Sequence, residues 1–296
     1  MVVSGIKAGV PFSKFLLDPN DTISVSDFSG NWGIGSYEGT AGWSSVNAMI
    51  HAPEQNVQGY INLAESTGPP AWGCGPDTGT NMEALINPSS STAEVNMFKG
   101  TNWAHFASGK AHVNFKIDGD VLDFTGPFES ETSYGPPYQD IYSRFIYGFT
   151  TVGPYDVAFW HVAPQGEPTK YATVGYLAEN NRLIVNKCDT VNKNGTDSTT
   201  IDTTGSFNVT GLSLEIPGSL TIDFTDKYGK HFEFAIDTVQ AAGASFPTGN
   251  TVSAQATASG GVVDGHQCNG SAFLLYFSAP GGEYKHSNPL QWSYAN

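Results

Sequence analysis

Charge is scarce in this sequence, and positive charge is the scarcest. Charged residues make up 14% of the 296 positions, against about 25% in an average globular protein. Lys and Arg number 13, without a cluster, whereas Asp and Glu number 28, so the formal net charge is −15. Phosphate backbones bind clustered Lys and Arg, so we do not expect a nucleic acid partner. We interpret the acidity as what keeps a surface with few ionic groups soluble.

Long hydrophobic runs are also missing. No apolar stretch approaches the roughly 20 residues that span a bilayer, and the N-terminus lacks the apolar core of a signal peptide. We predict no membrane span, and we expect a secreted or secretory-pathway protein whose leader is absent from this chain. The cytoplasm is the alternative. Sequons lie at Asn20, Asn194, Asn208 and Asn269, and the secretory pathway would expose them to glycosylation.

Cysteine is rare, with Cys74, Cys188 and Cys268 as the complete set. Three thiols can form at most one intrachain bridge. We predict the pair Cys188–Cys268, because both residues lie in the second half and a bridge fits an oxidising compartment. Three free thiols in a reducing cell are the alternative. Neither a C-x-x-C pair nor a His-rich spacing occurs, so we expect no metal site.

Several enzyme motifs are absent as well. The sequence has no G-x-S-x-G nucleophile turn, no Walker loop and no dinucleotide-binding G-x-G-x-x-G after a strand. We therefore expect no cofactor. Two carboxylates from distant strands could still cleave a glycoside, so a carbohydrate-active protein stays open. No pattern sets an oligomeric state.

What the chain has in quantity is short alternating strands and turns. Polar and apolar residues alternate over 111–117, 219–224 and 231–236, and Gly numbers 34. No window of twelve residues has a helical period with caps, although 82–93 could hold one short helix. The sequence predicts an all-β protein of two antiparallel β-sandwich or barrel units packed together. A polar tract at 186–204 suggests a first domain over 1–185 and a second over 186–296.

The most distinctive stretch is 124–176, where aromatic strands alternate with Gly and Pro turns. Phe124-Thr-Gly126 opens it, and an aromatic strand ends in Phe145-Ile-Tyr-Gly148. Val152-Gly-Pro-Tyr155 forms the next turn, and Val157-Ala-Phe-Trp-His161 forms the next strand. Val174-Gly-Tyr176 closes the pattern. So many rings with so few charges indicate a cavity for a flat, hydrophobic ligand.

These motifs resemble the fungal Diels–Alderases and their carotenoid 1,2-hydratase-like relatives, over roughly 100–185. The resemblance implies two lipocalin-like domains that hold a small hydrophobic substrate. The His-Asp pair of the family's turn is Ser130 and Glu131 here, and the Trp of that turn is Tyr134. Loss of the His disfavours water addition and leaves ring closure as the better match. The chain length further resembles the hetero-Diels–Alderases of tropolonic sesquiterpenoid biosynthesis, in fungal secondary metabolism.

Cycloaddition needs aromatic walls, correct positioning and a hydrogen-bond donor at a carbonyl, without a nucleophile or metal. The catalytic candidates are Arg144 as a donor, Tyr134 as a donor and Glu131 as a proton carrier. The candidate substrate-binding residues are Trp43, Trp103, Tyr147, Tyr155 and Trp160.

Each of these residues has a structural alternative. An aromatic residue on a strand often only packs across the sheet, and Arg144 could pair with Glu131 or Asp140. For the whole protein, two other functions stay open. One is a non-catalytic carrier of a hydrophobic metabolite, because lipocalin-like cavities serve either role. The other is a secreted carbohydrate-active β-sandwich.

Overall fold

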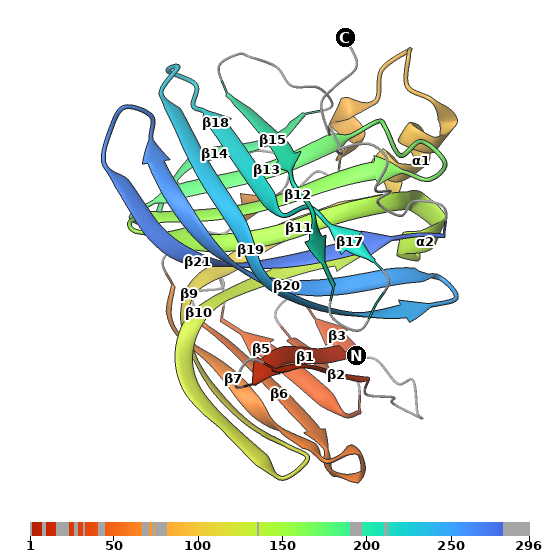
Figure 1. Ribbon diagram of the computed structural model, residues 1–296, viewed down its shortest axis with the longest axis vertical. Helices are drawn as coiled ribbons and strands as arrows, with labels where there is room; N and C mark the ends of the chain where they lie inside the picture. The colour runs from red at the N-terminus through yellow and green to blue at the C-terminus, as the bar shows by residue number, and fades with distance from the viewer. Residues whose placement is uncertain are drawn as a thin grey trace.

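The computed structural model describes residues 2–7, 10–15, 24–26, 29–31, 33–40, 45–66, 71–72, 74, 82–134, 136–189, 197–209, 212 and 214–280, with only the backbone at 2–26, 64–66, 72, 102–108, 127 and 130–134. Within these residues nearly all regular structure is antiparallel β-sheet, which confirms the predicted all-β class. Two large sheets form the molecule, one above the other in Figure 1.

The first sheet has the order β10-β9-β7-β6-β5-β4-β3, with β8 paired to β9. Its strands are β3 (Ser24–Ser26), β4 (Ser29–Asn31), β5 (Gly35–Gly39), β6 (Val46–Ala52), β7 (Val57–Ser66), β8 (Ala71–Trp72), β9 (Asn102–Ile117) and β10 (Asp120–Tyr134). The long hairpin of β9 and β10 curves along the left of Figure 1. It turns through Asp118 and Gly119, both at positive φ, the conformation that an Asp-Gly hairpin turn adopts.

The second sheet is a nearly closed barrel with the order β14-β13-β12-β11-β21-β20-β19-β18-β15. Its strands are β11 (Tyr142–Val152), β12 (Tyr155–Pro164), β13 (Ala172–Glu179), β14 (Arg182–Asp189), β15 (Ser198–Thr204), β18 (Ser219–Thr225), β19 (His231–Phe246), β20 (Gly249–Val262) and β21 (Gln267–Ser278). Two hairpins stand outside both sheets, β1 (Val2–Lys7) with β2 (Val10–Phe15), and β16 (Phe207–Asn208) with β17 (Glu215–Ile216).

The barrel closes through side chains between its first and last strands. The Thr199 amide of β15 donates to the Asp189 carboxylate of β14 at 3.2 Å, and Lys187 pairs with Asp197 at 3.0 Å. Gly175 of β13 is required here, because a Cβ at that position would lie 2.2 Å from the Thr199 hydroxyl oxygen. The closure encloses the inside of the barrel, which is filled by a hydrophobic core that includes Phe159, Phe224 and Phe234.

The boundary between the two sheets does not coincide with the domain boundary predicted at 185/186. The chain passes from the first sheet to the barrel between Tyr134 and Tyr142. Strands β11 to β14, which the prediction grouped with residues 1–141, lie in the same sheet as β15 to β21. Position 185 falls inside β14. The polar tract at 186–204 therefore contains the end of β14 and all of β15, two strands of the same barrel.

Short helices cover part of the outer face of the barrel. They are η2 (Met82–Leu85), α1 (Thr92–Gly100) and α2 (Tyr138–Ile141), with η1 (Pro53–Gln55) at a turn of the first sheet. α1 begins at a capping box in which Ser91 and Glu94 bond each other's backbone amides. The short helix predicted within 82–93 is thus two elements, η2 and the start of α1.

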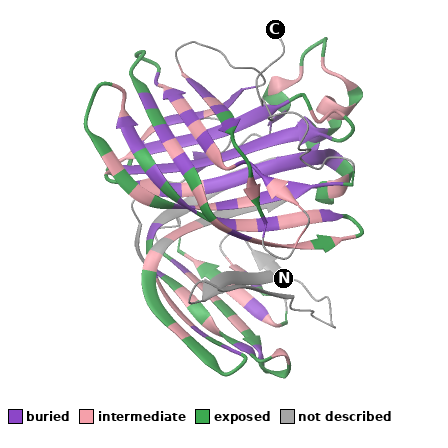
Figure 2. Ribbon diagram, viewed as in Figure 1, coloured by how far each residue is buried: buried purple, intermediate pink, exposed green. Residues whose placement is uncertain are grey.

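Because the helices cover this wall, strands β11 to β13 are buried on both faces. All ten residues of β12 are buried, as the continuous purple of the central strands in Figure 2 indicates. Strands covered on both faces are nearly continuous apolar runs, and Tyr155–Pro164 is one that only Asp156 and His161 interrupt. The wall of the barrel therefore has an outer face that is sheltered from water.

Candidate functional site

The outer face of β11 to β13 carries rows of residues that the strand register fixes. Tyr147 lies opposite Trp160, which lies opposite Val174. In the next row Phe149 lies opposite Ala158, which lies opposite Tyr176. All of these side chains pack in one cluster with α1, α2 and η2. The small Ala158 side chain therefore lies among larger rings.

A carboxylate from the first sheet meets this wall. The Tyr147 hydroxyl donates a hydrogen bond to Glu129 Oε2 of β10. Tyr147 is 6% exposed, and Glu129 is half-buried. A charge-assisted bond of this kind is stronger than one between neutral groups. The contact joins the two sheets, and it places a carboxylate above an aromatic wall.

Further polar groups stand beside this pair. Burial, together with the carboxylates of Asp156 and Glu129, raises the pKa of the Tyr176 phenol above its ordinary value. Tyr176 therefore keeps its proton at neutral pH and can act as a hydrogen-bond donor. Thr151 donates to Asp156 at 3.0 Å in the row beyond. The polar part of the wall thus contains a carboxylate acceptor, Glu129, and a phenol donor, Tyr176, close enough to interact electrostatically.

The predicted substrate-binding residues separate into two groups. Tyr147 and Trp160 are neighbours on the outer face. Tyr155 points to the opposite, inner face, where it packs on Phe232 and Phe234. Trp43 lies outside the described residues, and so does the side chain of Trp103.

The predicted catalytic residues also lie apart from that pair where they are described. Arg144 belongs to the inner face, opposite Ala163 of the barrel core. Its Nη2 donates to the Pro168 carbonyl at 2.6 Å and to the Tyr171 hydroxyl, and its guanidinium lies 5.4 Å from the Tyr171 ring centre. The side chains of Glu131 and Tyr134 lie outside the described part of the chain.

Next to Arg144 the inner face holds a fully buried histidine. His161 Nδ1 lies 2.7 Å from the Thr173 hydroxyl, and its ring stacks on Tyr171 at 4.7 Å. Burial, with the nearby Arg144 charge, lowers the pKa of His161 from 6.5 to about 3. The folded protein therefore keeps this imidazole neutral.

Acid should destabilise the fold through His161. The unfolded chain binds a proton below pH 6.5, whereas the folded chain does so only near 3, so stability is lost as the pH falls between these values. From pH 7 to 5 the loss amounts to about 2 kcal/mol. The variant His161→Gln should lose about that much less over the same interval, measured by urea unfolding at both pH values. Equal losses in the two proteins would show that His161 does not carry the effect.

The predicted disulfide is wrong. Cys188 is bonded to Cys74, and Cys268 is a free thiol. The two predicted partners lie on opposite faces of the barrel wall: Cys188 packs in the outer cluster, whereas Cys268 packs against the inner core. Shared location in the second half of the chain was therefore a poor guide. The actual bond fastens the segment before η2 to β14, beside the aromatic wall.

The sequons can be placed only in part. Asn208 and Asn269 are exposed, whereas Asn20 and Asn194 lie outside the described residues. Within the described ranges no group of three or more His, Cys, Asp or Glu side chains could hold a metal ion. Nor does any helix there have the length and apolar character to cross a membrane.

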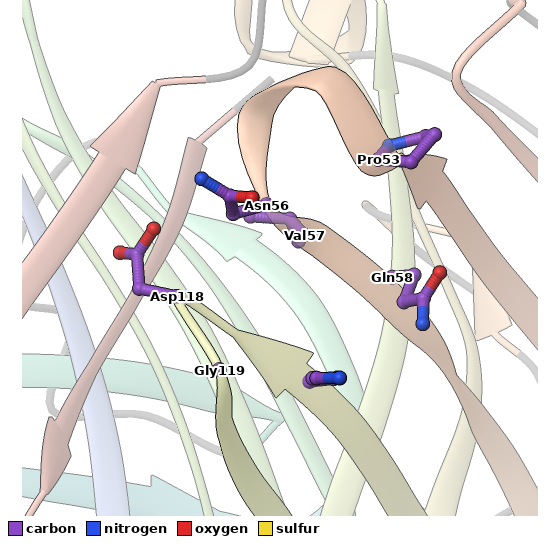
Figure 3. A pocket seen from close by; sticks show the side chains of 7 residues that line it. Pro53, Asn56, Val57, Gln58, Asp118 and Gly119 are labelled. Carbon is purple, nitrogen blue, oxygen red and sulfur yellow. The ribbon is translucent and has the colours of Figure 1, made fainter.

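A separate hollow lies far from this wall, at one end of the first sheet (Figure 3). It has a volume of about 410 Å³ and lies between the turn at Pro53–Gln58 and the hairpin turn at Asp118–Gly119. Its rim includes Gln58 and Lys116, which are exposed polar residues. Because it lacks aromatic side chains and is open to solvent, we do not take it as the site for a flat hydrophobic ligand.

The architecture defines a lipocalin-like protein with a nearly closed antiparallel barrel joined to a second sheet. No family model matches the sequence, and no curated protein matches it either. Solved structures with the same fold do exist. The sequence did not single out Glu129, Asp156 and Tyr176, the polar residues that the structure brings together at this wall.

One such structure is CghA with Sch210972, at a TM-score of 0.63 and 13% identity, covering 94% of this chain and 73% of that chain. CghA alone gives 0.62 and 14% identity with the same coverage. Kievitone hydratase from Nectria haematococca gives 0.52 and 10% identity, covering 84% of this chain and 69% of that chain. These likenesses confirm the predicted resemblance at the level of the fold.

Proposed function

We propose that this protein is a cofactor-independent cyclase that joins the π systems of a hydrophobic substrate in a Diels–Alder or hetero-Diels–Alder reaction. The observation that carries the proposal is the Tyr147–Glu129 hydrogen bond, which sets a carboxylate of the first sheet against Tyr147, the cross-strand neighbour of Trp160 on the barrel wall. A sheltered aromatic surface with few, well-placed polar groups is the usual form of a small-molecule site.

Positioning supplies most of the rate in such a reaction. Holding two reacting groups in a productive geometry can give effective molarities of about 10⁵–10⁸ M. The polar groups then act on the electronics of the substrate. The Glu129 carboxylate accepts a hydrogen bond from an enol or phenol hydroxyl, which raises electron density in the diene. The Tyr176 phenol donates to a carbonyl on the other component, where negative charge develops.

We base the proposed substrate class on the family resemblance and on the fold neighbours. CghA is a Diels–Alderase, and its structure holds Sch210972. We propose a polyene, or a quinone methide with a terpene olefin, as the substrate, and fungal secondary metabolism as the setting. The fold likeness supports a ligand-binding role, and the Glu129 pair favours catalysis over simple storage.

We also propose that the protein matures in the secretory pathway. Disulfides persist in oxidising compartments, and the bond between Cys74 and Cys188 fits such an origin. The exposed Asn208 and Asn269 would be accessible to glycosylation there. Mass spectrometry of the protein from its native source should find glycans on one or both residues. Unmodified peptides from both sites would count against this origin.

The two other functions make different demands on the wall. A non-catalytic carrier needs the aromatic face to bind its ligand, but a carboxylate in that face does not help binding. Burying a carboxylate under a hydrophobic ligand costs free energy unless the charge is paired. A carbohydrate-binding site stacks sugars on exposed rings, whereas Tyr147 and Trp160 are 6% and 3% exposed. Burial of these two rings therefore favours a hydrophobic ligand.

The test is a product comparison. The protein should be mixed with a quinone-methide precursor and a terpene olefin, and the adducts should be separated on a chiral column. We expect adduct formation at least tenfold faster than in buffer, with one enantiomer in large excess. A racemic product at the buffer rate, with the ligand still bound, would identify a carrier instead.

A further inference from the structure

Beside the polar part of the wall lies a set of rings that we call the aromatic box, formed by Tyr142, Phe145, Trp160 and Phe277. Phe145 stacks on Phe277 at 5.3 Å and meets Trp160 edge-on at 5.6 Å. Tyr142 lies 5.8 Å from Trp160. All four side chains are buried in the outer cluster of the barrel wall. The box is rigid, because all four of its residues belong to paired strands of the barrel, with Tyr142 as the first residue of β11.

A fifth ring, Tyr138, occupies the box from outside. Its centroid lies 5.2 Å from Phe145, 5.9 Å from Tyr142, 6.1 Å from Phe277 and 6.5 Å from Trp160. Unlike the box residues, Tyr138 is 40% exposed, and it is the first residue of the four-residue helix α2. A surface side chain thus fills the space above a buried aromatic floor.

One polar atom of the box lacks a partner. Trp160 Nε1 is fully buried and has no hydrogen-bond acceptor among the described residues. Its neighbour Tyr142 is satisfied, since the Tyr142 hydroxyl lies 2.6 Å from the Thr101 hydroxyl. Aromatic faces are only weak acceptors of an N–H group. Buried donors are rarely left unpaired without a reason, and a ligand that brings an acceptor is such a reason.

Tyr138 can leave the box without dismantling α2. Two hydrogen bonds from Gln165 hold the helix. The Gln165 amide donates to the Ile141 carbonyl at 3.0 Å, and Gln165 Nε2 donates to the Gln139 carbonyl at 3.0 Å. Neither bond involves the Tyr138 side chain. Rotation about its Cα–Cβ bond would carry the ring into solvent, and side-chain rotations of exposed residues are fast.

We infer that the aromatic box is a binding subsite for a flat unsaturated ring that carries a carbonyl oxygen, and that Tyr138 holds the place of this ring until the ligand enters. Trp160 Nε1 donates its hydrogen bond to the carbonyl oxygen. The inference rests on the proposed function, because it assigns one component of the cycloaddition to the box and leaves the hydroxyl-bearing component to Glu129. A flat ring takes the same contacts that the Tyr138 ring now makes.

Two probes of nearly equal shape test the subsite: 2-acetylnaphthalene, which has a carbonyl oxygen, and 2-ethylnaphthalene, which does not. Removing the occupying ring with Tyr138→Ala should tighten binding of both probes by at least threefold in equilibrium dialysis. The acetyl probe should bind that variant about fivefold to tenfold more tightly than the ethyl probe, the worth of one neutral hydrogen bond. In the double variant Tyr138→Ala, Trp160→Phe this preference should vanish.

Controls separate the subsite from general effects. Tyr228→Ala removes a tyrosine that is 77% exposed on a barrel turn, and it should leave both affinities unchanged. Tyr138→Phe keeps a ring in the box and should bind the probes as weakly as the unaltered protein. If Trp160→Phe lowers the melting temperature, Trp160→Tyr keeps more of the ring volume and serves as a second variant.

The outcomes distinguish this inference from the proposed function. Equal affinity for the two probes in Tyr138→Ala, or a preference that survives the loss of Trp160, would overturn the subsite. The dialysis needs no turnover. If the dialysis distinguishes the two probes but the product assay shows no cyclisation, the subsite stands and the proposed enzyme activity is rejected. If the product assay shows cyclisation but the dialysis does not distinguish the probes, the activity stands and the subsite is rejected.

Discussion

Replacing Glu129 by glutamine should lower the rate of cyclisation by about 10²-fold, the usual contribution of one well-placed proton-accepting or charge-stabilising group. Glutamine keeps the size of the side chain and can still accept a hydrogen bond from Tyr147. It loses the negative charge, which is what raises electron density on a substrate hydroxyl. Single-turnover kinetics with the substrate pair of the product assay would measure the loss. KM should change by less than about threefold, since the effect belongs to the transition state.

A matched control lies on the opposite face of the same wall. Glu179 of β13 bonds the Tyr155 phenol, so it is a second carboxylate–tyrosine pair outside the proposed site. Glu179→Gln should therefore leave the rate within about twofold. Tyr147→Phe, which removes the group that positions Glu129, should give a smaller loss of about tenfold in kcat. Equal rates for Glu129→Gln and Glu179→Gln would remove Glu129 from the mechanism.

Loss of the Cys74–Cys188 bond should have the largest effect on stability. The bond closes a loop with a sequence separation of 114 residues, and a loop of that order is worth about 4–5 kcal/mol in the chain-entropy account. We expect Cys74→Ser to lower the free energy of unfolding by roughly 4 kcal/mol, with a drop in Tm on the order of 10 °C. Urea unfolding and thermal melts, each with and without a thiol reductant, would measure both quantities.

The third cysteine supplies the control. Cys268 is a free thiol that packs against the inner core, so Cys268→Ser should change the free energy of unfolding by less than about 1 kcal/mol. Reductant should destabilise this variant as much as it destabilises the unaltered protein. If reductant changed neither protein, or if alkylation labelled Cys74 in the folded state, the assigned bond would be contradicted.

The sequence predicted the strands better than it predicted their faces. The aromatic hairpin over 142–164 was expected from its alternation and its Gly-Pro turn, and it is β11 and β12. Side chains alternate between the two faces of a strand, so residues five positions apart point to opposite faces. This alternation places Tyr155 and Trp160 on opposite faces of β12. Applying that rule within each strand would have placed Arg144 away from Tyr147 as well.

Glu129 was beyond the reach of local reasoning. The family resemblance drew attention to Glu131, two residues further along β10, and no spacing rule favours one carboxylate over the other. What selects Glu129 is its contact with Tyr147, which depends on how the first sheet meets the barrel. The disulfide likewise joins distant segments, since Cys74 and Cys188 are 114 positions apart and meet in the outer cluster. Contacts between distant segments are a tertiary property.

The strand order of the barrel has a consequence for how the protein is made. β21 is the last described strand to be synthesised, yet it lies between β11 and β20 and joins the two halves of the barrel. Until 267–278 leave the ribosome, β11 and β20 each present an unpaired edge, and such edges attract other chains. Folding must wait for a pairing between residues more than a hundred positions apart, which is intrinsically slow. During translation this protein should therefore depend strongly on chaperones, and truncation before β21 should yield aggregates rather than a smaller folded barrel.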